Sequence, residues 1–414
     1  MAKNDGRQGM NTRLAHAGHD PHAYFGFVNP PVVHASTVLF PDAATMASRS
    51  QKYTYGTRGT PTSDALAQAV DELEGSAGTI VVPSGLAAVT VPLLAFAAAG
   101  DHVLITDSVY HPTRHFADTM LKRMGVEVEY YDPHAGAGIA SLFRPNTRIV
   151  FTESPASNTF EVQDIPAIAR AARQAGAVVM MDNTWATPLY FRPLDHGVDI
   201  SIHAATKYPA GHSDVLLGTV SANEACWQRL HEGFVTLGCC AGPDDVYQVL
   251  RGLRTMGVRL EHHRRSALEI AAWLEGQRGI ARVLHPALPG HPDHALWSRD
   301  FSGSSGIFSV VLDGGGQKQA HAFLDALEAR LREAPGALVF LDLDNLKPLN
   351  DLHGHEAGDA ALRTTARLLR GTAAPGDIAA RFGGDEFILW IAGADAAAAV
   401  QRARALLARA AAQG

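Results

Sequence analysis

Short segments that are apolar at nearly every position alternate with helical stretches from about residue 61 to residue 203. A strand of this kind has to be covered on both faces, and alternation with helices is how a parallel sheet becomes covered. We therefore predict an α/β domain with a mostly parallel sheet over residues 61–256. The predicted strands are Gly78–Val82, His102–Thr106, Val126–Tyr130, Arg148–Thr152, Ala177–Met181 and Asp199–His203, with helices such as Ser63–Leu73 and Asp164–Gln174 between them.

The remaining chain divides into three further parts. Residues 1–60 are rich in Gly, Pro and His and show little periodicity, which indicates an extended arm. A long helix near Asp245–Leu274 leads to a strand at Gly306–Leu312, within a small domain over residues 257–328. Residues 329–414 predict a strand at Ala337–Leu343, a helix at about 356–370, a hairpin at about 378–391 and a helix at about 394–412. This βαββα order is a ferredoxin-like unit without its last strand.

The composition narrows the class of protein. Among 414 residues, 46% are hydrophobic and 19% charged, as in ordinary globular proteins, and the net charge is −7. This charge favours neither nucleic acid nor an anionic membrane as a partner. The three cysteines have no metal-ligand spacing, and the polar N-terminus has no apolar core of a secretory signal. We expect a cytoplasmic protein without a membrane span.

The predicted parallel strands end in residues suited to a cofactor with a phosphate and a carbonyl. Ligands bind at the carboxyl ends of such strands. There Asp182 could keep a pyridine nitrogen protonated, and Lys207 could form a Schiff base. The turn Pro83–Leu86 joins a strand to a helix, whose N-terminus suits a phosphate, and Tyr110 could stack on a ring. Each signal alone is weak, and the prediction depends on their order and spacing.

A series of segments extends this pattern over residues 10–328. They are VNPPVVHASTVLF, YGTRGTPTS, PSGLAAVT, TDSVYHPT, VVMMDNTWATPL, DHGVDISIHAATKY, GHSDVLLGT, GPDDVYQVLRGLRT and RVLHPALPGHP. In these segments the chain resembles the Cys/Met-metabolism family of enzymes that use pyridoxal phosphate (PLP), and within it the cystathionine β-lyase branch. The resemblance implies a fold-type I, aminotransferase-like large domain, a homo-oligomer (dimer or tetramer) and a small sulfur-containing amino acid as substrate.

The resemblance also implies roles for individual residues. Lys207 is then the lysine that carries PLP and moves protons, Asp182 contacts the pyridine nitrogen, and Tyr110 stacks on the ring. Gly85, Leu86 and Thr206 surround the phosphate, Tyr55 reaches the phosphate in a neighbouring subunit, and Ser157 favours β-chemistry over γ-chemistry. Two features depart from the family. The phosphate-binding arginine is replaced by Thr57, with Arg58 as its candidate substitute, and the segment that supplies the substrate-carboxylate arginine is missing after about Glu328.

A second set of residues indicates nucleotide and metal binding near the C-terminus. Asp342 ends a predicted strand and Glu386 lies in a Gly-Gly turn, so the two carboxylates could hold Mg²⁺ between nucleotide phosphates. LDLDNLKPLNDLHGHEAGDAAL and RFGGDEF resemble the diguanylate cyclase (GGDEF) domain. That resemblance implies that Asp342 and Glu386 bind metal, Lys347 a GTP phosphate, and Asn350 and Asp359 the guanine. The family's N-terminal segment and final strand are absent, and the Arg-x-x-Asp product site reads Ala374-Pro-Gly-Asp377.

The two resemblances meet at Ala322–Glu328, a string that suits a helix of either family. A join inside this string explains why each family loses its expected continuation. The leading interpretation is a PLP-dependent β-lyase that cleaves cystathionine to homocysteine, pyruvate and ammonia, impaired by the loss of the carboxylate site. The alternatives are a diguanylate cyclase or cyclic di-GMP signalling module, and a protein that binds PLP without catalysis.

Overall fold

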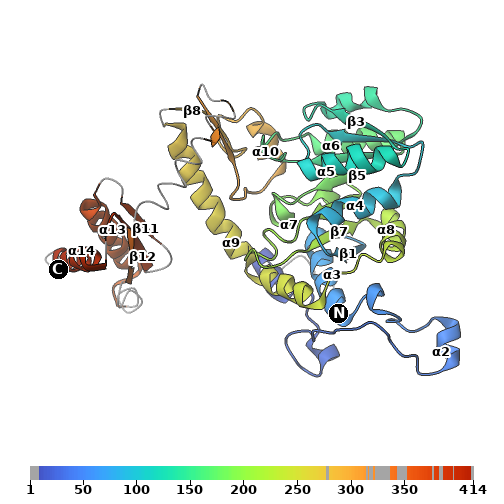
Figure 1. Cartoon of the computed structure of the whole chain (residues 1–414), viewed down its shortest axis with the longest axis horizontal. Helices are drawn as coiled ribbons and strands as arrows, with labels where there is room; N and C mark the ends of the chain where they lie inside the picture. The colour runs from blue at the N-terminus through green and yellow to red at the C-terminus, as the bar shows by residue number, and fades with distance from the viewer. Residues whose placement is uncertain are drawn as a thin grey trace. The chain divides into compact units, whose positions relative to one another are not determined.

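The computed structural model describes residues 9–276, 279–313, 316, 320–321, 336–342, 352–374, 377–381, 386–394 and 396–411. The chain divides into two compact units, which we call the first unit (Met1–Gly314) and the second unit (Gly315–Gly414). Figure 1 follows the chain through both. None of the described helices is both long and apolar enough to cross a lipid bilayer.

A seven-stranded sheet forms the centre of the first unit, in the order β1-β7-β6-β5-β4-β2-β3. Its strands are β1 (Gly78–Val82), β2 (His102–Thr106), β3 (Glu127–Tyr131), β4 (Thr147–Glu153), β5 (Val178–Asp182), β6 (Ile200–His203) and β7 (Gly218–Ala222). Only β7 is antiparallel to its neighbours, β1 and β6. The α/β class with a mostly parallel sheet is confirmed, and the six strands predicted for this sheet are correct to within one residue at each end. The strand predicted at Gly306–Leu312, outside this sheet, begins three residues later, at Ser309. The sequence-based prediction did not include β7.

Helices cover both faces of this sheet, which explains why its strands are apolar at successive positions. On β4, Ile149 and Phe151 pack into a core with helices α4 and α8, whereas Val150 between them packs into a core with α6. The helices are α1 (Met10–His16), α2 (Ala43–Ser48), α3 (Pro61–Glu74), α4 (Gly85–Phe96), α5 (His111–Phe116), α6 (Ile165–Ala175), α7 (Thr187–Tyr190), α8 (Glu224–Leu237), α9 (Pro243–Glu275) and α10 (His294–Asp300).

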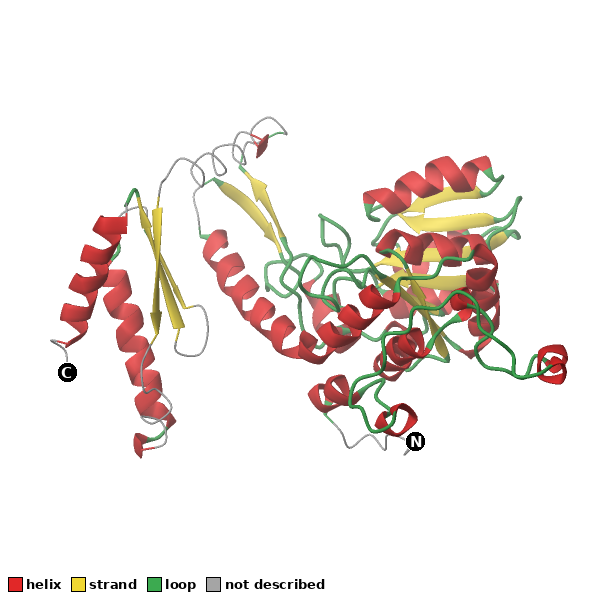
Figure 2. Ribbon diagram, turned by 60° about the horizontal axis from the view of Figure 1, so that its bottom comes forward, coloured by secondary structure: helices red, strands yellow, loops and turns green. Residues whose placement is uncertain are grey.

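Two further features complete the first unit. Between α1 and α3 the chain runs as a long loop that carries α2 and extends away from the sheet (Figures 1 and 2). We call residues 17–60 the arm; its Phe25, Phe27 and Leu39 are exposed. Beyond α9, the strands β8 (Ile280–Leu284) and β9 (Ser309–Leu312) form a small antiparallel pair.

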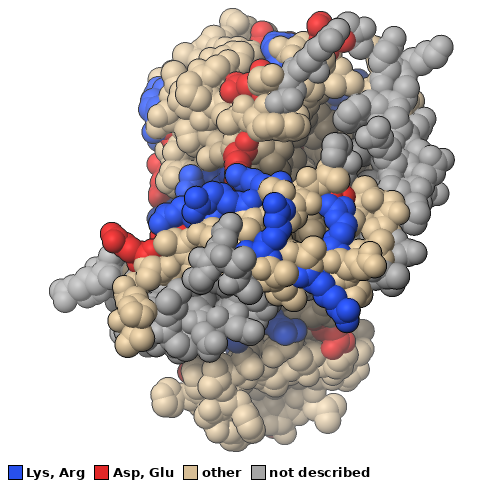
Figure 3. Space-filling model, turned by 90° about the vertical axis from the view of Figure 1, so that its left-hand side faces the viewer, with Lys and Arg blue, Asp and Glu red and all other residues tan. Residues whose placement is uncertain are grey.

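The second unit contains a three-stranded antiparallel sheet in the order β10-β12-β11. Its elements follow the predicted βαββα order: β10 (Gly336–Asp342), α13 (His355–Thr372), β11 (Ile378–Arg381), β12 (Glu386–Ala392) and α14 (Ala396–Ala411). Leu369 of α13, Leu389 of β12 and Leu406 of α14 lie in one core. Exposed arginines of α13 and α14 give this unit a basic face (Figure 3), among them Arg363, Arg367, Arg370, Arg404 and Arg409.

Candidate active site

The candidate cofactor residues of the first unit follow the carboxyl ends of strands that run in the same direction. Because β1, β2, β4, β5 and β6 are parallel, the segments after them emerge at one edge of the sheet. Those segments and strand ends carry Gly85, Leu86, Tyr110, Ser157, Asp182, Thr206 and Lys207. The topology therefore brings residues from five separate regions of the sequence to one edge.

Lys207 lies in a tight turn four residues after the end of β6. Its backbone N–H donates to the carbonyl of Ala204 at 3.0 Å, and its side chain is exposed. The lysine lines a cleft of about 600 Å³, together with Thr206, Tyr208, Gly211, Ser213, Asp214, Val215, Leu216, Arg259, His263, Gly306 and Ile307. The cleft thus joins the lysine turn to helix α9 and to the segment before β9, and an amine with free space around it is available for chemistry.

Asp182 is the last residue of β5 and is tied to the lysine turn through Thr184. Its Oδ1 accepts the N–H of Thr184 at 2.9 Å, and the hydroxyl of Thr184 accepts the N–H of Ala204 at 2.9 Å. Burial raises the pKa of the Asp182 carboxyl, and hydrogen bonding by Thr184 opposes this shift. No cation among the described residues contributes to that pKa. The carboxyl therefore lacks a positive partner within the described part of the chain.

The N-terminus of α4 packs directly against the lysine turn. The hydroxyl of Ser84 caps this helix by accepting the N–H of Ala87 at 3.0 Å. A Cβ at position 85 would lie 2.6 Å from the Cβ of Ala204, so only glycine allows this approach. Leu86 is partly exposed beside it. The hydroxyl of Thr206 is engaged locally, since it exchanges hydrogen bonds with the backbone of Leu217.

Tyr110 lies between β2 and α5 with its ring about half exposed. Its backbone N–H donates to Oε2 of Glu153 at 2.8 Å. Glu153 is the last residue of β4 and is buried, and sequence reasoning did not include it or Thr184 among the site residues. A glutamate shortly after the apolar run Ile149–Phe151 was the available signal. Ser157 follows it in the loop after β4 and is partly buried.

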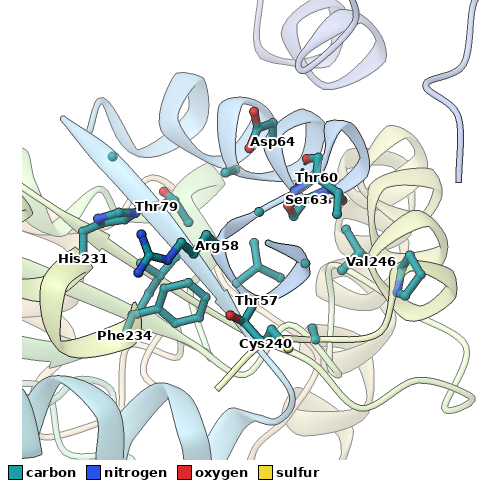
Figure 4. Close-up of a pocket in the computed structure, with 18 of the residues that line it drawn as sticks. Thr57, Arg58, Thr60, Ser63, Asp64, Thr79, His231, Phe234, Cys240 and Val246 are labelled. Atoms are coloured by element: carbon teal, nitrogen blue, oxygen red, sulfur yellow. Dashed lines mark hydrogen bonds between the residues drawn. The ribbon is translucent and has the colours of Figure 1, made fainter. Parts of the chain in front are cut away.

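Tyr55 and Arg58 lie away from the lysine cleft. Both line a second cleft of about 610 Å³, between the arm, α3, β1 and α8, and the two clefts share no lining residue. Figure 4 shows Arg58 near Thr79, His231 and Phe234. That Tyr55 reaches the PLP phosphate of a neighbouring subunit, with Arg58 as the substitute for the phosphate-binding arginine, stays a prediction.

In the second unit, the two candidate metal-binding residues belong to the neighbouring strands β10 and β12. Asp342 and Glu386 are cross-strand partners of the antiparallel pair. Asp359 is exposed on α13. Lys347 and Asn350 lie outside the described residues. No group of three or more His, Cys, Asp or Glu residues in the described parts of the chain could hold a metal ion.

Comparison with known proteins assigns the family. Residues 11–333 match the model of the Cys/Met metabolism PLP-dependent enzymes. The chain belongs to this family. Residues 318–413 match the model of the diguanylate cyclase GGDEF domain, so the two matches overlap over residues 318–333. The chain is therefore a fusion of a PLP-enzyme region with a GGDEF region.

Individual relatives agree with this assignment. A protein of Rhizobium johnstonii, provisionally named cystathionine beta-lyase, is 71% identical over 323 residues, which are 77% of this chain and 82% of that protein. Cystathionine beta-lyase MetC of Escherichia coli is 46% identical over 310 residues, 73% of this chain and 78% of that protein. The crystal structure of metB from Corynebacterium glutamicum shares the fold, with a TM-score of 0.72 at 24% identity over 98% of this chain and 99% of that one.

The residues at the sheet edge fit PLP. The Asp182 carboxyl, whose pKa is raised by burial and which has no described cation to neutralise it, suits a protonated pyridine nitrogen. The capped N-terminus of α4 at Gly85 presents backbone N–H groups suited to a phosphate. The Lys207 amine stands in open space on the adjoining turn. The carboxyl for the pyridine nitrogen, the site for the phosphate and the lysine amine thus lie at the same edge of the sheet.

Proposed function

We propose that this protein is a carbon–sulfur β-lyase that cleaves cystathionine to homocysteine, pyruvate and ammonia. The observation that carries the proposal is the convergence of Asp182, the N-terminus of α4 and Lys207 at one sheet edge, tied together by Thr184 and Ala204. The names of the relatives from Rhizobium johnstonii and Escherichia coli support the same reaction.

The chain's own residues would divide the work as follows. Lys207 would attach PLP and, once substrate is bound, its amine would take the proton from the substrate Cα. Asp182 would hold the pyridine nitrogen protonated, and Gly85 and Leu86 at the N-terminus of α4 would hold the phosphate. Tyr110 would cover the ring. When bound, PLP supplies an electron sink that stabilises the charge left at Cα and so allows the β-sulfur to leave as thiolate.

The lysine cleft is the expected substrate site, but the arginine that lines it already forms hydrogen bonds within the protein. The described lining includes one arginine, Arg259, whose Nε donates to Thr255 and whose Nη2 donates to the carbonyls of Gly252 and Pro209. This guanidinium stabilises the wall of the cleft and offers little to a substrate carboxylate. Together with the family segment missing after about Glu328, this supports a β-lyase with weakened substrate binding.

The purified protein tests this function directly. We expect a yellow protein whose visible absorption changes on addition of cystathionine, with pyruvate appearing in the same sample. Lys207→Ala is the matched control and should produce neither signal. If the wild-type protein is yellow, Lys207→Ala is not, and no pyruvate is released, the result would instead support PLP binding without catalysis.

We further propose that the protein works as a homo-oligomer, in which Tyr55 and Arg58 reach the cofactor of a neighbouring copy. The arm that carries them exposes Phe25 and Leu39, and a second copy would remove these side chains from water. Mixing Lys207→Ala protein with Tyr55→Phe protein tests the arrangement. Restored lyase activity in the mixture is expected, because some hybrid sites then combine both intact residues.

A second candidate function belongs to the GGDEF region. The register of Asp342 with Glu386 favours a Mg²⁺–GTP site there, with Lys347 at a phosphate and Asn350 and Asp359 at the guanine. Equilibrium dialysis with Mg²⁺ and GTP, compared with Glu386→Ala, tests for the site.

A further inference from the structure

Two acidic side chains lie side by side at the edge that holds the candidate cofactor site. Glu153 and Asp182 are the last residues of β4 and β5 and are cross-strand partners in the parallel register. Neighbouring strands are about 4.8 Å apart, and partners in register point to the same face. Glu153 is 8% exposed. Two ionised carboxylates in such a position would repel each other strongly, because little water screens them.

Glu153 also fixes the backbone of Tyr110. Its Oε2 accepts the Tyr110 N–H at 2.8 Å, across the gap between β4 and the segment after β2. The strand end that carries Glu153 is itself held firmly, since Gln163 donates from Nε2 to the Glu153 carbonyl at 2.9 Å and accepts from the Tyr131 hydroxyl at 2.8 Å. Tyr110 opens α5 without a side-chain cap of its own. The carboxyl of Glu153 is therefore a rigid anchor for the residue expected to cover the cofactor ring.

The electrostatics of the pair favour a proton on Glu153. Burial raises the pKa of Glu153 well above its ordinary value, and the charge of Asp182 raises it further. Hydrogen bonds from the N–H groups of Tyr110 and Ser157 act in the opposite direction. Asp182, on β5, is the one titratable group among the described residues that contributes. A pyridinium beside Asp182 would hold the negative charge on that residue and leave the proton on Glu153.

We propose that Glu153 is a positioning residue of this site: a neutral carboxylic acid that anchors the Tyr110 backbone and leaves the negative charge of the pair on Asp182. The part of this inference that concerns the cofactor rests on the proposed function. The part that concerns the protonation of Glu153 is independent of PLP.

Two substitutions separate the acceptor from the charge. Glu153→Gln keeps an oxygen that accepts the Tyr110 N–H and reproduces the neutral state, so its PLP dissociation constant should stay within about threefold of wild type. The circular dichroism of bound PLP, which reports how the ring is held, should also stay unchanged. Glu153→Ala leaves the Tyr110 N–H without its partner, and we expect roughly tenfold weaker PLP binding and altered dichroism. Glu153→Met serves in its place if the alanine variant does not fold.

The apoprotein provides a measurement that does not depend on PLP. A carboxyl whose pKa is raised on folding stabilises the fold below its unfolded pKa, and that contribution is lost as the pH rises through the folded pKa. Relative to wild type, Glu153→Gln should therefore gain stability in urea unfolding between pH 5 and pH 8. Glu74→Gln is the matched control, because Glu74 is also buried but contacts Ser201 on a different strand. It should gain stability with pH in the same way and leave the dichroism of bound PLP unchanged.

Each outcome decides the matter. If Glu153→Gln binds PLP as weakly as Glu153→Ala, the site needs a negative charge on Glu153 and the proposal is wrong. If Glu153→Ala matches wild type in binding and dichroism, Glu153 does not position Tyr110. If the stability difference between Glu153→Gln and wild type does not change from pH 5 to pH 8, Glu153 is not held neutral. If wild type binds no PLP, the proposed function fails, and the urea experiment alone still tests the protonation.

Discussion

The two units of this chain bring acidic residues together in different ways. In the first unit, Asp182 and Glu153 meet because β4 and β5 are parallel and both end at one edge of the sheet. In the second unit, Asp342 and Glu386 are backbone partners because β10 and β12 are antiparallel, so the end of one strand pairs with the start of the other. The first arrangement gathers residues from many strands, whereas the second is made by a single strand pair. A site of the first kind is therefore supported by much more of its fold.

The units also differ in how they hold buried carboxyls. In the first unit, burial raises the pKa of Glu74 to about 7, despite a hydrogen bond from Ser201 and the charge of Arg192. In the second unit, burial acts to raise the pKa of Asp377, but hydrogen bonds from Ala374, Arg402 and Ala392 outweigh it and lower that pKa. The two carboxyls thus give their units opposite dependence on pH.

The largest expected effect separates the two candidate activities. Lys207→Ala should remove covalently bound PLP and lower pyruvate release from cystathionine by roughly 10²–10⁴-fold, because the general base and the cofactor link are lost together. Glu386→Ala should leave both unchanged. Borohydride trapping followed by peptide mapping locates the cofactor, and an assay for pyruvate measures the turnover. PLP trapped on another lysine would show that the site is misassigned.

The next largest effect concerns the stability of the first unit. Glu74 has a folded pKa of about 7 against an ordinary value of 4.5, so its contribution is present below about pH 4.5 and is lost as the pH rises through 7. At about 1.36 kcal/mol per pKa unit, the loss is about 3 kcal/mol. Urea unfolding of the apoprotein should show Glu74→Gln gaining up to this amount over wild type between pH 5 and pH 8. An equal difference at both values of pH would contradict the burial of a protonated Glu74.

A smaller effect concerns the substrate. Losing one charge-assisted contact to the substrate carboxylate costs about 1.5–3 kcal/mol, which is roughly tenfold to a hundredfold in kcat/KM. We expect the kcat/KM for cystathionine to lie that far below the value of the Escherichia coli relative, measured side by side. Full activity would mean that another cation of this chain binds the carboxylate, and Arg330→Ala and Arg332→Ala would identify it.

The sequence was informative where one residue type or a local pattern decides the structure. Strands β1 and β2 begin and end at the predicted residues, because continuous apolar runs bounded by Gly, Pro and Asp leave little choice. Strand β7, with the sequence GTVSA, was missed because its small residues resemble a loop. It is buried between β1 and β6, and Gly218 at its start lies close to the backbone of Ser84, which is a contact between residues 134 positions apart.

The site shows the same division. Asp182 and Lys207 could be proposed from the strands that precede them, since a carboxyl end points to a ligand site whatever the neighbouring strand is. The importance of Glu153 could not be predicted from the sequence, because it depends on the register of β4 with β5 and on the position of the Tyr110 backbone. Likewise, Thr184 connects Asp182 to the lysine turn only once β5 and β6 lie next to each other.

The smallest expected effect concerns the GGDEF region, for which we expect no cyclic di-GMP synthesis. The N-terminal segment that the resemblance leads us to expect of a diguanylate cyclase is absent from the sequence before β10. In the described sheet β10 is an outer strand, paired on one side by β12, and it carries Asp342. Outer strands of this kind are less firmly held, and a misplacement of about 1 Å can cost a hundredfold in rate. Incubation with Mg²⁺ and GTP followed by mass spectrometry measures the product, and cyclic di-GMP that disappears in Glu386→Ala would overturn the expectation.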